Sequence, residues 1–107
     1  MTTFDKREEG FENKFAHDEE MAFRAQARRN KLLGLWAADK LGLHGAEAEA
    51  YAGEVMTVGL DASGGDAVVG KLHKDFDAKA VIQSDHQIRR TMEELMARAL
   101  IEIKAGR

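Results

Sequence analysis

The chain has 107 residues, a length that suits one domain, and 44% of the residues are hydrophobic while 33% are charged. It lacks cysteine, which excludes disulfides and cysteine-ligated zinc and is compatible with a reducing cytoplasm. The net charge of -3 argues against nucleic acid as a partner, and no apolar run approaches the ~20 residues of a membrane span. The charged N-terminus has no apolar h-region, so we expect no secretory signal and no direct membrane insertion.

The first predicted element is an N-terminal arm over residues 1–17, which contains the stretch FDKREEGFENKF. At about 100° per residue, Phe4, Phe11 and Phe15 fall within an arc of about 40° on one helix face. The sequence therefore predicts an amphipathic helical arm with a narrow aromatic seam. Gly10 costs that helix roughly 1 kcal/mol, so we expect the arm to be less helical in the free protein than the bundle. The pattern alone leaves open whether the seam packs on the chain's own bundle or binds a partner.

Residues 18–107 are expected to form the bundle domain, and its first two helices follow from caps and apolar spacing. Asp18 is expected to cap the first helix, which ends with Gly42 as the residue after the last turn. The stretch 32–41 is apolar on most sides, so we expect it at the centre of the bundle, with Trp36 in the core. A second helix is expected over about residues 45–58.

Two further helices complete the prediction. Asp66 is expected to cap a short third helix, in which one face is apolar, and Gly70 weakens that helix. Ser84 and Gln87 have the spacing of a capping box and mark the start of the fourth helix. No segment alternates with period two, so we predict an all-α, four-helix bundle with an N-terminal amphipathic arm. The apolar stripes that support the last two helices are Val69, Leu72 and Phe76, followed by Ile88, Met92, Leu95, Met96, Ala99 and Ile103.

The sequence contains no catalytic constellation that we can recognise. Neither a phosphate-binding loop nor a dinucleotide-binding glycine pattern is present. The histidines show no H-x-x-x-H or H-E-x-x-H pattern, and His17 with Glu20 would form only half of a di-metal motif. We therefore expect no enzyme activity, no catalytic residues and no metal site.

The only basic cluster is RRNK, which contributes Arg28, Arg29 and Lys31. On a helix these charges spread around the axis and do not form one stripe. Such residues usually solvate a surface or pair with glutamate, but they can also contact an acidic partner or a nucleotide phosphate. A small helical module that binds adenine nucleotide and acts as a regulator is therefore an alternative function.

Three stretches carry a resemblance to a known family. They are KFAHDEEMAFRAQARRNKLLGLWAADKLGL at residues 14–43, AEAYAGEV at residues 48–55 and HQIRRTMEEL at residues 86–95. They resemble the zeta-subunit family, the ATPase inhibitor subunits of the F-type ATP synthase in alpha-proteobacteria. The resemblance covers essentially the whole chain.

The resemblance implies a four-helix bundle and a function as a protein inhibitor that blocks ATP hydrolysis by the synthase. In the family, an N-terminal helix inserts at a catalytic alpha/beta interface near the central stalk. This implies a cytoplasmic location, peripheral on the membrane-bound synthase, with the catalytic sector (alpha, beta and central stalk) as the partner. The residues implied to bind the partner are Phe4, Lys6, Arg7, Glu8, Phe11, Lys14 and Phe15.

The resemblance also implies weak binding of ATP or ADP on the bundle, for which Arg28, Arg29 and Lys31 are the candidates. One position departs from the expected family pattern. Gly10 stands where a helix-favouring small residue such as alanine is expected, which weakens the arm's helix.

Overall fold

The computed structural model describes the backbone of residues 2–61 and 64–106, and the side chains of residues 18–61 and 64–106. The described residues form four helices and no strand, which confirms the prediction of an all-α, four-helix fold. The helices are α1 (Thr2–Lys40), α2 (Ala46–Val58), α3 (Gly65–Ala78) and α4 (Asp85–Lys104).

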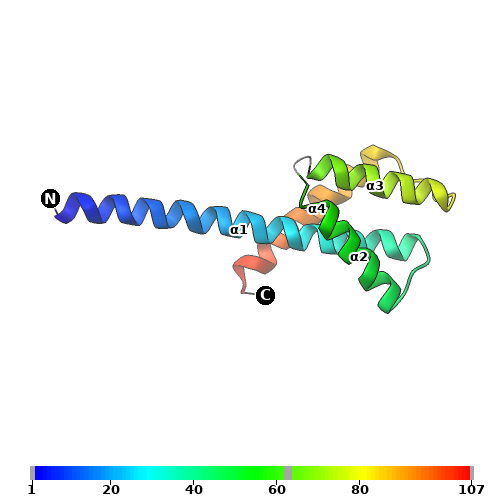
Figure 1. Ribbon diagram of the computed structural model, residues 1–107, viewed down its shortest axis with the longest axis horizontal. Coiled ribbons are helices and arrows are strands. Elements are labelled where there is room, and N and C mark those ends of the chain that lie inside the picture. Colours follow the sequence, from blue (N-terminus) through cyan, green and yellow to red (C-terminus); the bar gives the residue numbers. More distant parts are fainter. Residues whose placement is uncertain (1, 62–63, 107) are drawn as a thin grey trace.

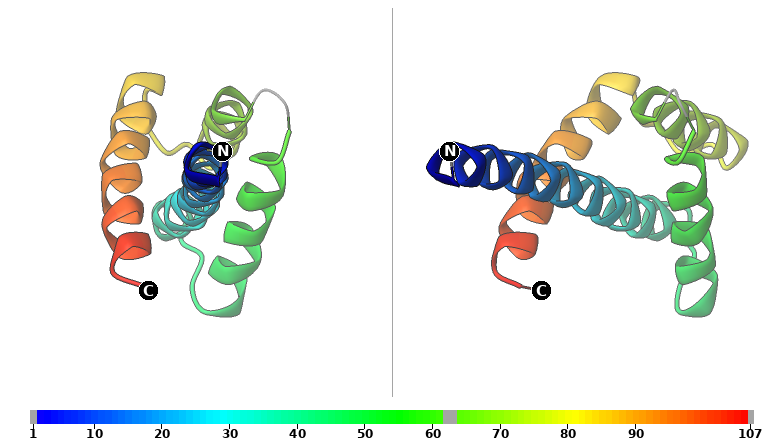
Figure 2. Two further views of the ribbon diagram at one scale, coloured as in Figure 1. Left: turned by 90° about the vertical axis from the view of Figure 1, so that its left-hand side faces the viewer. Right: turned by 60° about the vertical axis from the view of Figure 1, so that its left-hand side comes forward.

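The C-terminal half of α1 is the central element of the bundle. Seen along its axis, α1 lies between α2 and α4, and α3 covers a third side (Figure 2). The N-terminal half of α1 extends beyond the other three helices, so the molecule measures 65 × 25 × 20 Å (Figure 1). The bundle and the projecting helix therefore share one uninterrupted element.

The core forms where the four apolar stripes meet. From α1 it contains Leu33, Ala37 and Ala38, which confirms that the stretch 32–41 lies at the centre. Trp36 is partly buried and packs edge-to-face on Phe76, with ring centroids 5.8 Å apart and an interplanar angle of 88°. The remaining core side chains are Tyr51, Val55, Val68, Val69, Leu72, Ile88 and Met92.

Gly34 permits the close crossing of α1 and α2. A Cβ atom at this position would lie 2.7 Å from the Cα atom of Ala52 and 3.2 Å from the Cβ atom of Val55. Because the nearest of these atoms belongs to the backbone, only a shift of a whole helix could make room for it. The missing side chain thus sets the distance between the two helices.

Two predicted helix ends are confirmed. The hydroxyl of Ser84 accepts a hydrogen bond of 3.1 Å from the backbone N–H of Gln87, and the Gln87 side chain accepts one of 2.9 Å from the N–H of Ser84. This is the capping box expected at the start of α4. Gly42 follows α1 with φ of 77°, the left-handed conformation expected after the last turn.

Two predicted helix starts are wrong. Asp18 does not begin a helix, because α1 runs through it from Thr2 to Lys40. Between Gly10 and Gly34 there is neither proline nor glycine to stop the helix, so it continues through the expected boundary. Asp66 lies in the first turn of α3 and is not its cap; Gly64, with φ of 46°, turns the chain into the helix earlier.

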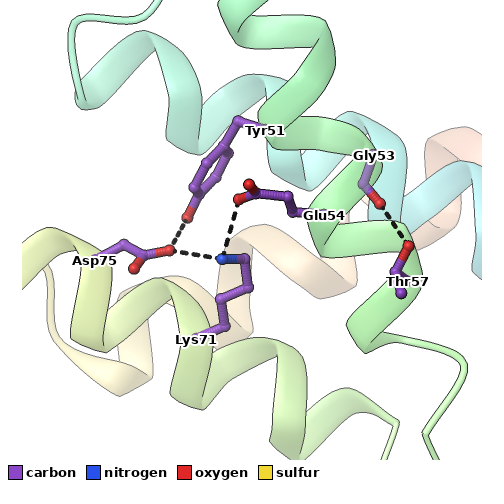
Figure 3. A network of polar contacts seen from close by, with 6 residues as sticks. All are labelled: Tyr51, Gly53, Glu54, Thr57, Lys71 and Asp75. Atoms are coloured by element: carbon purple, nitrogen blue, oxygen red, sulfur yellow. Dashed lines mark hydrogen bonds and ion pairs between the residues drawn. The ribbon is translucent and has the colours of Figure 1, made fainter.

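A polar network joins α2 to α3 (Figure 3). The hydroxyl of Tyr51 donates a hydrogen bond of 2.7 Å to Asp75, and the ammonium of Lys71 lies 3.1 Å from Asp75 and 3.3 Å from Glu54. Burial and the bond to Asp75 raise the pKa of Tyr51. Burial disfavours the charged form of Lys71, but its bonds to Asp75 and Glu54 outweigh this effect, so its pKa is also raised. The network therefore fixes the position of α3 against α2.

Candidate partner-binding site

The predicted arm forms the first turns of α1. Its backbone is helical from Thr2 onward, so the seam residues Phe4, Phe11 and Phe15 lie on one helix face by their spacing. Their side chains lie outside the described part of the structure. The same holds for the charged residues predicted to flank the seam, Lys6, Arg7, Glu8 and Lys14.

The base of the arm is the point where α1 enters the bundle. Of the side chains from position 18 to 24, all but Met21 are exposed, and Ala25 is the first described side chain of α1 that is buried. The preceding part of α1 extends away from α2, α3 and α4 in Figure 1. The described side chains at the base of the arm are thus mostly open to solvent.

An apolar cleft lies beside this base, between α1 and the C-terminal end of α2. Its volume is about 340 Å³. Phe23 is 60% exposed on one wall, and Leu60 is 70% exposed on the other. The cleft is lined by Phe23, Gln26, Ala27, Asn30, Gly53, Met56, Thr57, Gly59 and Leu60.

Asn30 is the buried polar side chain of this cleft, with an exposed fraction of only 4%. The guanidinium of Arg29 donates two hydrogen bonds to Asn30 Oδ1, from Nε at 3.2 Å and from Nη2 at 3.1 Å. These bonds fix the orientation of the amide, since only its oxygen can accept them. Nδ2 consequently faces Gly59, where even a Cβ atom would collide with it.

The three basic residues of the predicted nucleotide site do not converge. Arg28 and Lys31 line one open groove of about 500 Å³, together with Arg24. Arg29 instead lines a separate groove with Arg89, and burial lowers its pKa.

Acidic side chains also reach the first of these grooves. Glu49 and Glu102 line it, and Arg28 lies 3.8 Å from the Glu102 carboxylate. A phosphate there would meet cations and carboxylates together, so the groove favours phosphate less than a purely basic site does.

The described histidines form no metal site. His73 lies between two carboxylates, 3.1 Å from Asp77 and 2.7 Å from Asp85, and so links α3 to the start of α4. No group of three or more potential metal ligands occurs among the described residues. The side chain of His17, the other half of the pair with Glu20, lies outside the described residues.

The sequence does not single out Phe23 and Leu60 as residues of a site. Phe23 falls in a helix with apolar neighbours and gives no sign of its exposure, while Leu60 stands next to a turn-forming loop. The sequence contains only a weak indication of the cleft, namely two large apolar residues near the ends of predicted helices. Their proximity depends on how α2 crosses α1.

Fold and site together define a small, all-helical protein that presents one long helix beyond its core. None of the helices in the described part of the chain is both long and apolar enough to span a bilayer. The family profile described as ATPase inhibitor subunit zeta matches residues 1–102, so the chain belongs to this family.

A solved structure supports the same fold. It is a solution NMR structure with 40% sequence identity and a TM-score of 0.69, and the match covers 81% of this chain and 99% of that chain. The comparison with curated proteins found no match.

Proposed function

We propose that this protein inhibits the F-type ATP synthase by inserting the N-terminal part of α1 at a catalytic alpha/beta interface, near the central stalk. The family description, ATPase inhibitor subunit zeta, supports the inhibitory role. The observation that carries the mechanism is the long α1, whose backbone continues from the core as a helix beyond the bundle (Figure 1). On this proposal the protein is cytoplasmic and peripheral on the membrane-bound synthase.

The aromatic seam supplies the binding energy in this mechanism. Burial of a phenylalanine side chain is worth roughly 1.5–3 kcal/mol, and Phe4, Phe11 and Phe15 would be buried together in the partner. Lys6, Arg7 and Lys14 would meet the polar walls of the same interface. A helix anchored in the bundle at its other end also has less freedom to lose on binding than a disordered tail.

Inhibition of this kind requires no chemistry by the inhibitor. Rotary catalysis requires each catalytic interface to open and close in turn. A helix that binds one conformation of the interface more tightly than the others stabilises that conformation and stops the cycle. The protein is therefore proposed to be regulatory, without catalytic residues or a required cofactor.

The test is deletion of residues 1–16, followed by an assay of ATP hydrolysis by the isolated catalytic sector of the synthase. The intact chain should inhibit, whereas the shortened chain should not. Thermal unfolding of the shortened chain should remain cooperative, because the buried residues found in the described part of the chain all lie after position 16. Equal inhibition by the two chains would contradict the proposal.

A second candidate function is weak binding of adenine nucleotide on the bundle. It is supported by the groove that Arg24, Arg28 and Lys31 line together with apolar side chains. Titration of the chain lacking residues 1–16 with ADP should shift the NMR signals of these residues, and Lys31→Ala should reduce the shifts. Unchanged signals at millimolar ADP would rule out this site.

A further inference from the structure

The apolar cleft beside the base of the arm differs from the rest of the surface in its charge. Although 33% of the chain is charged, none of the nine residues that line this cleft is ionisable. The groove on the neighbouring side of α1, by contrast, carries Arg24, Arg28, Lys31, Glu49 and Glu102. An occupant of the cleft should therefore be uncharged and apolar where it contacts Phe23 and Leu60.

The cleft also contains the side-chain amide of Asn30, which can donate a hydrogen bond. Its Oδ1 accepts the two hydrogen bonds from Arg29, which leaves Nδ2 directed toward Gly59. Its side chain is buried to 96% by the neighbouring atoms, with only 4% exposed. An occupant that brings a carbonyl oxygen to this amide would gain a hydrogen bond.

The position of the cleft on α1 relates it to the arm. Phe23 lies eight residues after Phe15 on the same uninterrupted helix, which is about 12 Å along its axis and about 80° further round it. When the arm is inserted, the helix holds the cleft against the same partner, next to the inserted segment. The cleft thus continues the surface that the proposed function assigns to the arm.

We propose that the cleft between α1 and the end of α2 receives an uncharged, apolar segment of the synthase's catalytic sector. Phe23 and Leu60 contact apolar side chains of that segment, and Asn30 Nδ2 donates to one of its carbonyl oxygens. This inference rests on the proposed function. The contact in the cleft is a second contact beside that of the arm. It fixes the bundle against the partner and so restricts how far the arm can withdraw.

The first test uses Phe23→Ala and Leu60→Ala in the full chain. Both side chains are mostly exposed, so the variants should keep the unfolding temperature of the parent. Each should raise the concentration needed for half-inhibition of ATP hydrolysis about tenfold, the effect of losing one well-buried apolar contact. Ile82→Ala and Ile101→Ala are matched controls, because these side chains are 93% and 69% exposed outside the cleft.

The outcomes separate this inference from the proposed function. If deletion of residues 1–16 abolishes inhibition but Phe23→Ala and Leu60→Ala match the controls, the cleft proposal is wrong and the arm mechanism stands. If the deletion has no effect, both are wrong. If Phe23→Ala instead dissociates a dimer of the free protein, the occupant is a second copy of the chain and the proposal is also overturned.

The hydrogen bond proposed for the Nδ2 amide of Asn30 is tested with Asn30→Asp. The aspartate keeps an oxygen for the Arg29 guanidinium and a similar shape, but it loses the N–H groups that face Gly59. Inhibition should weaken about tenfold. A variant that stays folded and inhibits as well as the parent would overturn the role of the donor.

A second measurement does not depend on the folding of this variant. A photoreactive benzophenone side chain at position 60 should cross-link to an alpha or beta subunit. The same group at position 82 is the control and should not. Absence of a cross-link from position 60, in a complex that still inhibits, would contradict the proposal.

Discussion

The ionisation of Tyr51 can be measured without interference from other tyrosines, because it is the only tyrosine of the chain. It therefore tests the polar network between α2 and α3. Burial and the bond to Asp75 raise its pKa above the ordinary value of 10.0. The phenol is therefore held protonated in the folded state, and this contribution to stability is complete below pH 10.0 and is lost as the pH rises above it. Lys71, whose pKa is raised too, acts in the same direction.

The expected result is that tyrosinate absorbance appears only at a pH above the ordinary value, together with a decrease in unfolding temperature. Tyr51→Phe should remove the titration and cost about 1 kcal/mol at neutral pH, since it deletes one hydrogen bond. Spectrophotometric titration and thermal unfolding measure the two effects. A titration at the ordinary pKa in the folded protein would contradict both the burial of Tyr51 and its bond to Asp75.

The glycines provide a second prediction at this scale. Gly34→Ala should destabilise the protein by about 1–3 kcal/mol, because the new methyl group meets the backbone of Ala52 at 2.7 Å. Gly70→Ala is the matched change in α3, where nothing lies within 4 Å of the added atom. It should stabilise the protein by about 0.5–1 kcal/mol through the better helix propensity of alanine. Urea unfolding measures the change in the free energy of unfolding for both variants. Equal changes would contradict the close crossing of α1 and α2.

The sequence predicts best those helices whose caps and apolar spacing involve residues close together in the chain. The capping box at Ser84 and the apolar spacing of α4 involve residues within one or two turns, so the pattern itself contains the information. The start of α1 was mispredicted at Asp18 because a residue that suits a cap also tolerates the first turns of a continuous helix. Only the absence of any helix-breaking residue nearby argued for continuation.

The candidate site was less predictable than the helices. The seam of the arm follows from spacing alone, as does the spread of the RRNK charges around α1. The cleft does not, because it depends on the crossing of α1 and α2, which brings Leu60 close to Phe23. Likewise, Lys71 and Asp75 have the spacing of a helical ion pair, but only the packing of α2 against α3 brings Tyr51 to them.

The arm itself carries a prediction about Gly10. Gly10→Ala should strengthen the helix by about 1 kcal/mol, which corresponds to about fivefold stronger inhibition if the arm must be helical when bound. Amide exchange over residues 4–15 should be faster than over residues 86–103 in the parent and slower in the variant than in the parent. Gly70→Ala stiffens α3 and not the arm, so it should leave inhibition unchanged. Weaker inhibition by Gly10→Ala would mean that the bound arm is not a regular helix there.

At the scale of the whole molecule, one long helix serves two purposes. Its C-terminal half is the centre of the core, and its N-terminal half extends the molecule to 65 Å (Figure 1). Because α1 is continuous, a force on the projecting half is transmitted to the bundle, and a contact by the bundle in turn restrains the projecting half. On the proposed function, this coupling would let the small bundle anchor the inserted helix.

The central claim is that the aromatic seam contacts another protein and not the chain's own core. Its most direct test is the double variant with Phe11→Ala and Phe15→Ala, compared with Asn13→Ala on the opposite face of the helix. The account predicts a strong loss of ATPase inhibition for the double variant, unchanged inhibition for Asn13→Ala and an unchanged unfolding temperature for both. If the double variant instead loses the ~3–5 kcal/mol of stability that is typical of each core phenylalanine, the seam belongs to the bundle and the account is contradicted.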